Sequence, residues 1–248
     1  RCPSEWRESI FIDNKPTSEI DYSGLHIVML YAQQGIDYWA EVGADPYSIE
    51  TPEFLDTEYE TRDLAKRLLL IALNARDDRS AFSAFRSQAE AGSDGKHLKN
   101  AQLVQVLDGL REKHPAIADS IASDAGIDLM NMDSQITERI IDHYTEQSIP
   151  VLTIHDSYLV PDGLEADLEG QMSKAFEEVM GIGGIRLKEV TNHPEEYEPL
   201  DRESAIGFDH NAWEQAMTYR HTPPKTERYQ HQKTMFEENR RNHNQPKT

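Results

Sequence analysis

Cysteine and long apolar runs are the two features that the chain most clearly lacks. One cysteine, Cys2, occurs in 248 residues, which excludes a disulfide within the chain and any zinc site built from several cysteines. No apolar run approaches the ~20 residues that a membrane-spanning helix needs. The first residues also lack the charged and apolar blocks of a signal peptide. A cytoplasmic protein without membrane contact is therefore expected.

Basic residues are also scarce, with 25 Lys and Arg against 45 Asp and Glu and a formal net charge of −20. Proteins that bind nucleic acid mainly through its phosphates usually present a basic surface, so this balance argues against that simple class. Residues 219–248 differ, because they carry seven basic residues and three glutamates, a net charge of +4. This basic polar tail either contacts nucleic acid or a partner, or is a solvated terminus.

Two short apolar segments contain predicted β-strands that each end on an aspartate, Asp21 and Asp156. A carboxylate at a strand end is held rigidly and suits a hard divalent cation. If the two strands are neighbours, the pair can hold two Mg²⁺ ions about 3.5–4 Å apart, the geometry used for phosphoryl transfer. Taken alone, each aspartate is more often a turn former or helix cap, and His155 beside Asp156 can equally be a hydrogen-bonded turn histidine.

Residues 57–75 form the strongest predicted helix, because Leu64, Leu68 and Ile71 repeat on one stripe. Arg62 and Lys66 are four residues apart in this segment and therefore share one face. Such a cationic pair can bind phosphate groups. The alternative is a solvated helix face with ordinary salt bridges, which predicts that Arg62 lies on the exposed side.

The rest of the chain alternates strand and helix signals. A hairpin is predicted around the turn residues 13–16, and a further strand at 185–190. Helices are predicted at 25–35, 98–113, 116–122 and 164–180, with a long amphipathic helix opening at 133. Residues 36–52 are expected to be loop-rich, and 74–95 give no clear signal. This order predicts an α+β fold with one antiparallel sheet.

Three segments together resemble motifs A, B and C of the family A DNA polymerases and the related single-subunit phage-type RNA polymerases. They are Asp21-Tyr22-Ser23-Gly24-Leu25-His26, the Arg62-x-x-x-Lys66 helix and Ile154-His155-Asp156-Ser157. The resemblance covers roughly residues 9–190. It implies a polymerase palm-like antiparallel sheet with a mainly helical fingers subdomain. The implied parts are palm 1–56, fingers 57–128, palm 129–218 and the tail 219–248.

The resemblance implies a template-directed nucleotidyltransferase, a DNA-directed DNA polymerase-like enzyme. Asp21 and Asp156 would be catalytic and hold two Mg²⁺ ions, for which Mn²⁺ can substitute, with the Tyr22 carbonyl as a further ligand. Arg62 and Lys66 would grip the incoming nucleoside triphosphate. His155 would lie near the primer terminus of a nucleic-acid primer-template.

Departures from the family motifs leave the choice of sugar open. Eight residues after the motif B lysine, the family has a tyrosine at the nucleotide site, and this chain has Asn74. Five residues after the motif A aspartate, DNA polymerases have a glutamate that blocks the ribose 2′-hydroxyl, and this chain has His26. After the motif C aspartate, DNA polymerases have glutamate and the RNA polymerases serine, and this chain has Ser157.

The other departure is the lack of the family's usual thumb, because only about 20 residues precede motif A here. Either the grip on a duplex and the processivity are poor, or a separate chain or an N-terminal region supplies the thumb. Three functions stay open at this point: a nucleotidyltransferase, DNA or RNA polymerase-like; a catalytically impaired relative that binds or regulates; and a metal-dependent phosphohydrolase that uses the same two aspartates without a template.

Overall fold

The computed structural model describes residues 7, 10–12, 15–90 and 92–190. The chain divides into two units, Arg1–His193 and Pro194–Thr248, and all of the described residues belong to the first. The predicted basic tail, 219–248, therefore lies outside them, and the expected boundaries of the palm and fingers parts stay predictions. None of the helices that the structure describes is long and apolar enough to cross a membrane.

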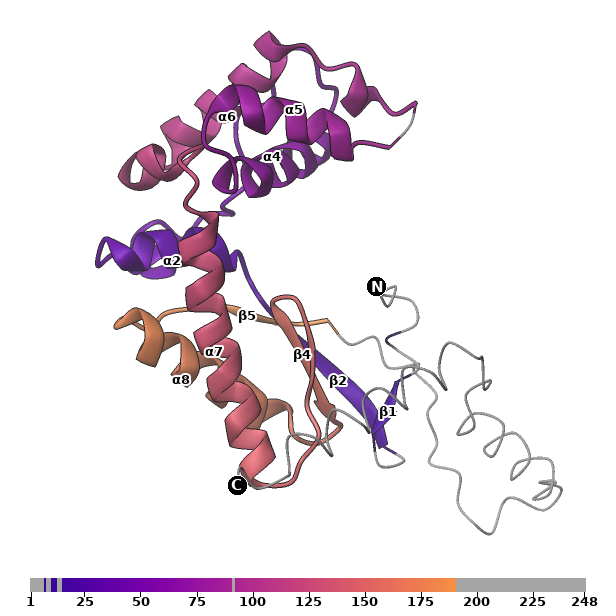
Figure 1. Ribbon diagram of the computed structural model, residues 1–248, viewed down its shortest axis with the longest axis vertical. Helices are drawn as coiled ribbons and strands as arrows, with labels where there is room; N and C mark the ends of the chain where they lie inside the picture. Colours follow the sequence, from indigo (N-terminus) through magenta and orange to yellow (C-terminus); the bar gives the residue numbers. More distant parts are fainter. Residues whose placement is uncertain (1–6, 8–9, 13–14, 91, 191–248) are drawn as a thin grey trace, which may run out of the picture. The chain divides into compact units, whose positions relative to one another are not determined.

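Five antiparallel strands form the sheet, which confirms the predicted sheet type (Figure 1). They are β1 (Phe11–Ile12), β2 (Lys15–Tyr22), β3 (Leu152–Ile154), β4 (Ser157–Pro161) and β5 (Leu187–Glu189). The order is β1-β2-β4-β3, and β5 pairs with β2. The predicted hairpin is confirmed, with Phe11 opposite Pro16. The long strand β2 is thus the centre on which the sheet is built.

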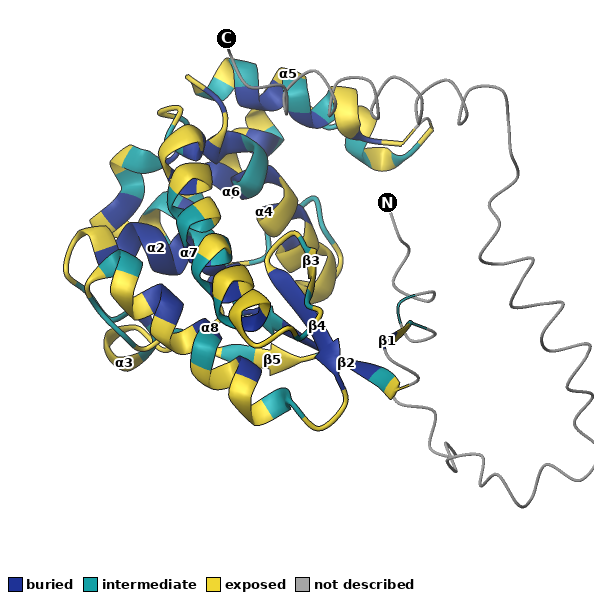
Figure 2. Ribbon diagram, turned by 60° about the horizontal axis from the view of Figure 1, so that its bottom comes forward, coloured by how far each residue is buried: buried dark blue, intermediate teal, exposed yellow. Residues whose placement is uncertain are grey.

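Helix α8 (Glu165–Met180) contacts β2, and α2 (Leu25–Gln33) and α7 (Gly126–Glu146) pack against α8. Successive side chains of a strand point to opposite faces. Ile20 and Tyr22 of β2 belong to the buried core (Figure 2), and the Tyr22 hydroxyl donates a hydrogen bond to the Met172 carbonyl of α8 at 2.7 Å. Glu19 and Asp21 therefore lie on the opposite face of β2.

A further group of helices makes up the mainly helical part that the fold class predicts. It contains α4 (Glu58–Leu73), α5 (Asp78–Gln88), α6 (Asn100–Lys113) and the short 3₁₀ segments η1 (Asp94–Lys96) and η2 (Pro115–Ser120). Helix α4 contacts both α5 and α6 (Figure 1). It begins where Thr57 caps it by accepting the Glu60 N–H. Leu64 and Leu68 are buried, so the apolar stripe read from the sequence is the packed face. The α+β class is confirmed.

Four predicted segments differ from the structure. Residues 36–52 contain a short helix, α3 (Tyr38–Glu41), because the Asp37 side chain accepts two backbone N–H groups at its start. Residues 74–95 contain α5, which opens with a capping box at Asp77. Residues 116–122 are mostly 3₁₀ rather than α, and Pro115 opens that turn. Helix α7 starts seven residues before 133, where exposed Ile127 breaks the amphipathic pattern.

Candidate active site

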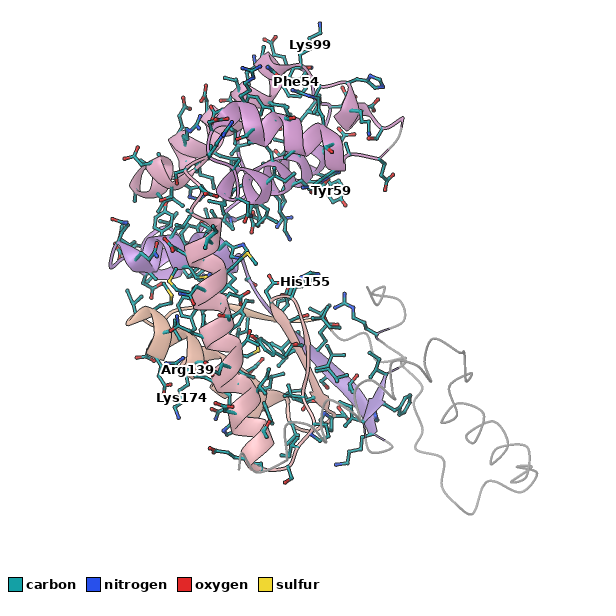
Figure 3. The ribbon with its side chains drawn as sticks, in the orientation of Figure 1. Phe54, Tyr59, Lys99, Arg139, His155 and Lys174 are labelled. Atoms are coloured by element: carbon teal, nitrogen blue, oxygen red, sulfur yellow. The ribbon has the colours of Figure 1, made fainter. Side chains whose placement is uncertain are left out.

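Strand register brings the two strand-end aspartates together. Strands β2 and β4 are antiparallel neighbours in which Asp21 lies opposite Ser157, the residue after Asp156. The Tyr22 N–H donates to the Asp156 carbonyl at 3.2 Å. Between β3 and β4 the chain reverses at His155, whose φ of 56° is left-handed, and Figure 3 shows His155 at the tip of this turn. Two acids 135 residues apart in the sequence thus lie side by side.

One cavity of about 620 Å³ collects most of the residues predicted for the site. Those that line it are Asp21, Tyr22, His26, Arg62, Lys66, His155 and Asp156. The Tyr22 ring is buried in the core on the other face of the sheet, so only its backbone is available to a ligand here.

Asn74 is the exception among the predicted residues, since the structure does not bring it into this cavity. It caps the end of α4, where its Nδ2 donates to the Leu70 carbonyl at 2.9 Å, and it lines a different hollow. Helix geometry gives the reason. Eight residues correspond to about 12 Å along the axis, and the short Asn74 side chain turns back to its own helix, so it does not reach the level of Lys66.

The surroundings of Asp21 disfavour the ionised form of its carboxyl group. Burial, followed by the nearby charge of Asp156, raises the pKa of Asp21 to about 7, although Lys66 and Lys188 act in the opposite direction. Lys188 of β5 is the direct cross-strand neighbour of Asp21. A carboxylate with a raised pKa beside a second carboxylate is a place where a bound cation would relieve repulsion. The site therefore fits a divalent metal.

The possible metal ligands are few. Within residues 7, 10–12, 15–90 and 92–190, no group of three or more His, Cys, Asp or Glu side chains is placed to hold a metal ion. Asp21 and Asp156 would therefore act with backbone oxygen, water and substrate oxygens, a donor set that suits Mg²⁺, which keeps several waters and takes one or two carboxylates.

Arg62 and Lys66 face the same cavity and share one aromatic partner. The Arg62 guanidinium carbon and the Lys66 Nζ each lie 5.5 Å from the centre of the Tyr47 ring, within cation–π range. Arg62 also pairs through Nε with Asp45 at 2.8 Å. The Arg62 side chain is 45% exposed, so it is both solvated, as the alternative interpretation requires, and aimed at the cavity.

The segment Asp45–Tyr47, here called the strap, is anchored by a buried histidine. The Nε2 atom of His114 lies 2.7 Å from the Pro46 carbonyl, and its Nδ1 lies 3.1 Å from the Tyr31 hydroxyl. Burial lowers the pKa of His114. In the neutral ring Nε2 must donate to the carbonyl, and Nδ1 therefore accepts from Tyr31. His114 thus holds the strap at the Pro46 carbonyl, and Tyr47 lines the cavity.

Two residues of the strap, Asp45 and Tyr47, have shifted pKa values. Burial, with the negative charge of Asp156, raises the pKa of Tyr47 to about 12, so the phenol stays neutral. Partial burial opposes ionisation of Asp45, but the Tyr47 N–H and the Arg62 guanidinium outweigh it and lower the pKa of Asp45. Asp45 is therefore an anion, matched to Arg62.

Four ionisable residues line the cavity without being among the predicted site residues: Asp45, Tyr47, Asp133 and Lys188. Asp133 of α7 has a pKa raised by burial, with His26 acting in the opposite direction, and its Oδ1 is buried with no hydrogen-bond partner among the residues that the structure describes. In the sequence Asp133 has the position of a helix opener. The strap lies in a segment without periodicity, so no local signal marks it.

The similarity of this chain to known proteins is limited to solved structures. No family model matches the sequence, and no curated protein does. Among solved structures, the chain is similar to the POL domain of Pol1 from M. smegmatis, solved in complex with DNA primer-template and dNTP. The TM-score is 0.46 at 10% sequence identity, over 74% of this chain and 41% of that chain. At this level the function has to be inferred from the residues of the cavity.

Proposed function

We propose that the protein is a template-directed nucleotidyltransferase, similar to a family A DNA polymerase, that joins nucleotides from nucleoside triphosphates to a 3′-hydroxyl. One observation carries the proposal: Asp21 and Asp156 lie side by side and line the same cavity as Arg62 and Lys66. Carboxylates suit divalent cations, and paired cationic side chains suit a polyphosphate. The order of the three motifs along the chain agrees with this assignment.

Asp21 and Asp156, with the Tyr22 carbonyl, would hold two Mg²⁺ or Mn²⁺ ions. When bound, such a metal pair activates the attacking hydroxyl and stabilises the pyrophosphate leaving group. The chain's own residues supply binding and orientation. Before a cation enters, burial and the negative charge of Asp156 raise the pKa of Asp21 to about 7, so Asp21 keeps its proton at acidic pH.

Arg62 and Lys66 would bind the triphosphate and turn its α-phosphate toward the two acids. The Tyr47 ring supports both cations, which limits the rotamers that each long side chain can adopt and lowers the entropy lost on binding. His155, at the tip of the β3–β4 turn, would contact the primer terminus. His26 would face the sugar of the nucleotide. The proposed partners are a nucleic-acid primer-template and nucleoside triphosphates.

A binding or regulatory module is the second candidate. The Arg62–Asp45 ion pair favours it, because an acid of the same chain already neutralises one of the two proposed phosphate-binding cations. A protein that does not turn over triphosphates has no need to keep that guanidinium available.

Primer extension tests the proposal. Wild type and Asp156→Asn should be assayed with Mg²⁺ and with Mn²⁺, supplied separately with deoxynucleotides and ribonucleotides. Incorporation by the wild type that disappears in Asp156→Asn supports the proposal. Nucleotide binding without incorporation favours the module. Hydrolysis of the triphosphate without chain growth favours a phosphohydrolase.

A further inference from the structure

Glu19 is a buried carboxylate that the proposed chemistry does not use. It precedes Asp21 by two residues on β2, so both side chains lie on the same face of the sheet. It is only 6% exposed. A carboxylate withdrawn from water to this extent has to be compensated by charged or hydrogen-bonding partners. The identity of those partners indicates what Glu19 does.

One of its partners is a cation, and another belongs to the turn that carries Asp156. The Arg7 guanidinium pairs with Glu19 Oε1. The Ser157 Oγ lies 2.7 Å from the same oxygen and 3.0 Å from the Ile154 carbonyl. A hydroxyl has one proton to donate, and an ionised carboxylate is the stronger acceptor. The Ser157 hydroxyl therefore donates to Glu19 of β2, and it also lies close to Ile154, the first residue of the β3–β4 turn.

This contact acts on Asp156 through one peptide bond. The turn is conformationally demanding, because His155 adopts a left-handed φ of 56° that L-residues rarely take. The Tyr22 N–H holds the Asp156 carbonyl from one side at 3.2 Å. The Glu19–Ser157 hydrogen bond holds the next residue through its side chain. Asp156 thus lies between a backbone hydrogen bond and a side-chain hydrogen bond, both made to β2.

We infer that Glu19 is a positioning residue. Through Ser157 it fixes the β3–β4 turn against β2 and so sets the spacing between the carboxylates of Asp156 and Asp21. The cation-dependent part of this inference rests on the proposed function. The part that concerns the turn does not. Glu19 acts as a hydrogen-bond acceptor, so an amide of the same shape should serve nearly as well as the carboxylate.

Two readouts on the full chain test this inference. Hydrogen exchange of the Tyr22 amide reports whether the turn still lies against β2, and calorimetric titration with Mn²⁺ reports whether the acids keep their spacing. We expect Ser157→Ala and Glu19→Ala to accelerate Tyr22 exchange about fivefold and to weaken Mn²⁺ binding about three- to tenfold, the loss of one hydrogen bond. Glu19→Gln should stay within about twofold of the wild type in both, because its Oε1 still accepts from Ser157.

Thr17→Val is the matched control. It removes a hydrogen bond of 3.1 Å to the Ile10 carbonyl from the same face of β2, away from the turn, and should change neither readout. Ser157→Ala deletes a single oxygen, so it keeps the test valid if Glu19→Ala fails to fold. The double variant Glu19→Ala/Ser157→Ala should be no worse than either single variant, because both remove the same contact.

Three results would overturn the inference. If Glu19→Gln loses Mn²⁺ binding as fully as Glu19→Ala while Tyr22 exchange is unchanged, Glu19 is itself a ligand. If the alanine variants lower only the melting temperature, the contact is merely structural. If Tyr22 exchange does not respond to Ser157→Ala, the turn is held by other means. Failure of the wild type to bind Mn²⁺ would instead overturn the proposed function, and Tyr22 exchange would still decide the role of Glu19.

Discussion

Arg62 and Asp45 form an ion pair of 2.8 Å that joins helix α4 to the strap. The buried His114 is hydrogen-bonded to the Pro46 carbonyl of the strap. Asp45, which pairs with Arg62, therefore belongs to a segment that is held in place. The pair lines the same cavity as the two strand-end aspartates. The free protein thus keeps one proposed phosphate-binding cation engaged with an internal anion.

Replacing Asp45 should make phosphate binding tighter. We expect Asp45→Asn to strengthen binding of inorganic triphosphate about two- to fivefold, since a partly exposed ion pair contributes about 0.2–1 kcal/mol and no longer competes. Asp63→Asn is the matched control, because Asp63 pairs with Arg67 on the same helix outside the cavity. Isothermal titration measures both. Weaker binding by Asp45→Asn would mean that Asp45 orients Arg62 rather than competing for it.

Asp156→Asn should abolish nucleotide incorporation while leaving the fold intact. The change removes one of the two proposed metal-binding carboxylates, and it also removes a negative charge that raises the pKa of Asp21. Primer extension and thermal unfolding should be measured on the same preparations. Asp128→Asn, an exposed α7 residue with the same change of charge, should retain wild-type incorporation. Residual incorporation by Asp156→Asn near the wild-type rate would exclude Asp156 from the chemistry.

The stability of the protein should fall as the pH rises from about 4 to about 7 through the titration of Asp21. The folded-state pKa of Asp21 is about 7, against about 3.9 in an unfolded chain. In this window the folded state holds a proton that the unfolded state has lost, so raising the pH favours unfolding. Above pH 7 both states are ionised and this dependence stops.

Asp21→Asn isolates that contribution, because an amide does not titrate. After allowance for solvent screening, we expect it to raise the free energy of unfolding at pH 8 by about 1–2 kcal/mol, with a much smaller change at pH 4. Denaturant unfolding at the two pH values measures the difference. An equal effect of the substitution at both pH values would mean that Asp21 has an ordinary pKa.

Lys66→Ala should weaken nucleotide binding about tenfold without changing Mn²⁺ binding, since the lysine is assigned to phosphate oxygens and the metals to the acids. Fluorescence titration with a nucleotide and calorimetric titration with Mn²⁺ separate the two effects. Arg67→Ala removes a cation from the next position of α4, where Arg67 pairs with Asp63, and should alter neither. An unchanged nucleotide affinity in Lys66→Ala would contradict its role.

The sequence predicts those parts of the fold that depend on local pattern. The stripe of Leu64 and Leu68 gives α4 to within two residues, and the turn residues 13–16 give the first hairpin. The adjacency of Asp21 and Asp156 is a long-range pairing that periodicity alone cannot reveal, and here it follows from the order of the motifs. The roles of these residues stay predictions that the experiments above address.

Other parts of the site could not be read from the sequence, for physical reasons. Tyr47 enters the cavity because His114, 67 residues later, holds the carbonyl before it, and nothing near Tyr47 encodes that contact. Lys188 becomes the neighbour of Asp21 only through the register of β5. The motif spacing predicts Asn74 at the nucleotide site, whereas its side chain turns back to the Leu70 carbonyl of its own helix and lines another hollow.

Tyr22 connects the two faces of the sheet. Its hydroxyl is bound to the Met172 carbonyl among the helices, and its amide is bound to the Asp156 carbonyl at the cavity. A substitution that shifts α8 by a few tenths of an ångström would pull on this one residue and thereby on the acid that it holds. Mutations in the interior, remote from the cavity, are therefore a route by which evolution could change the spacing of the two acids.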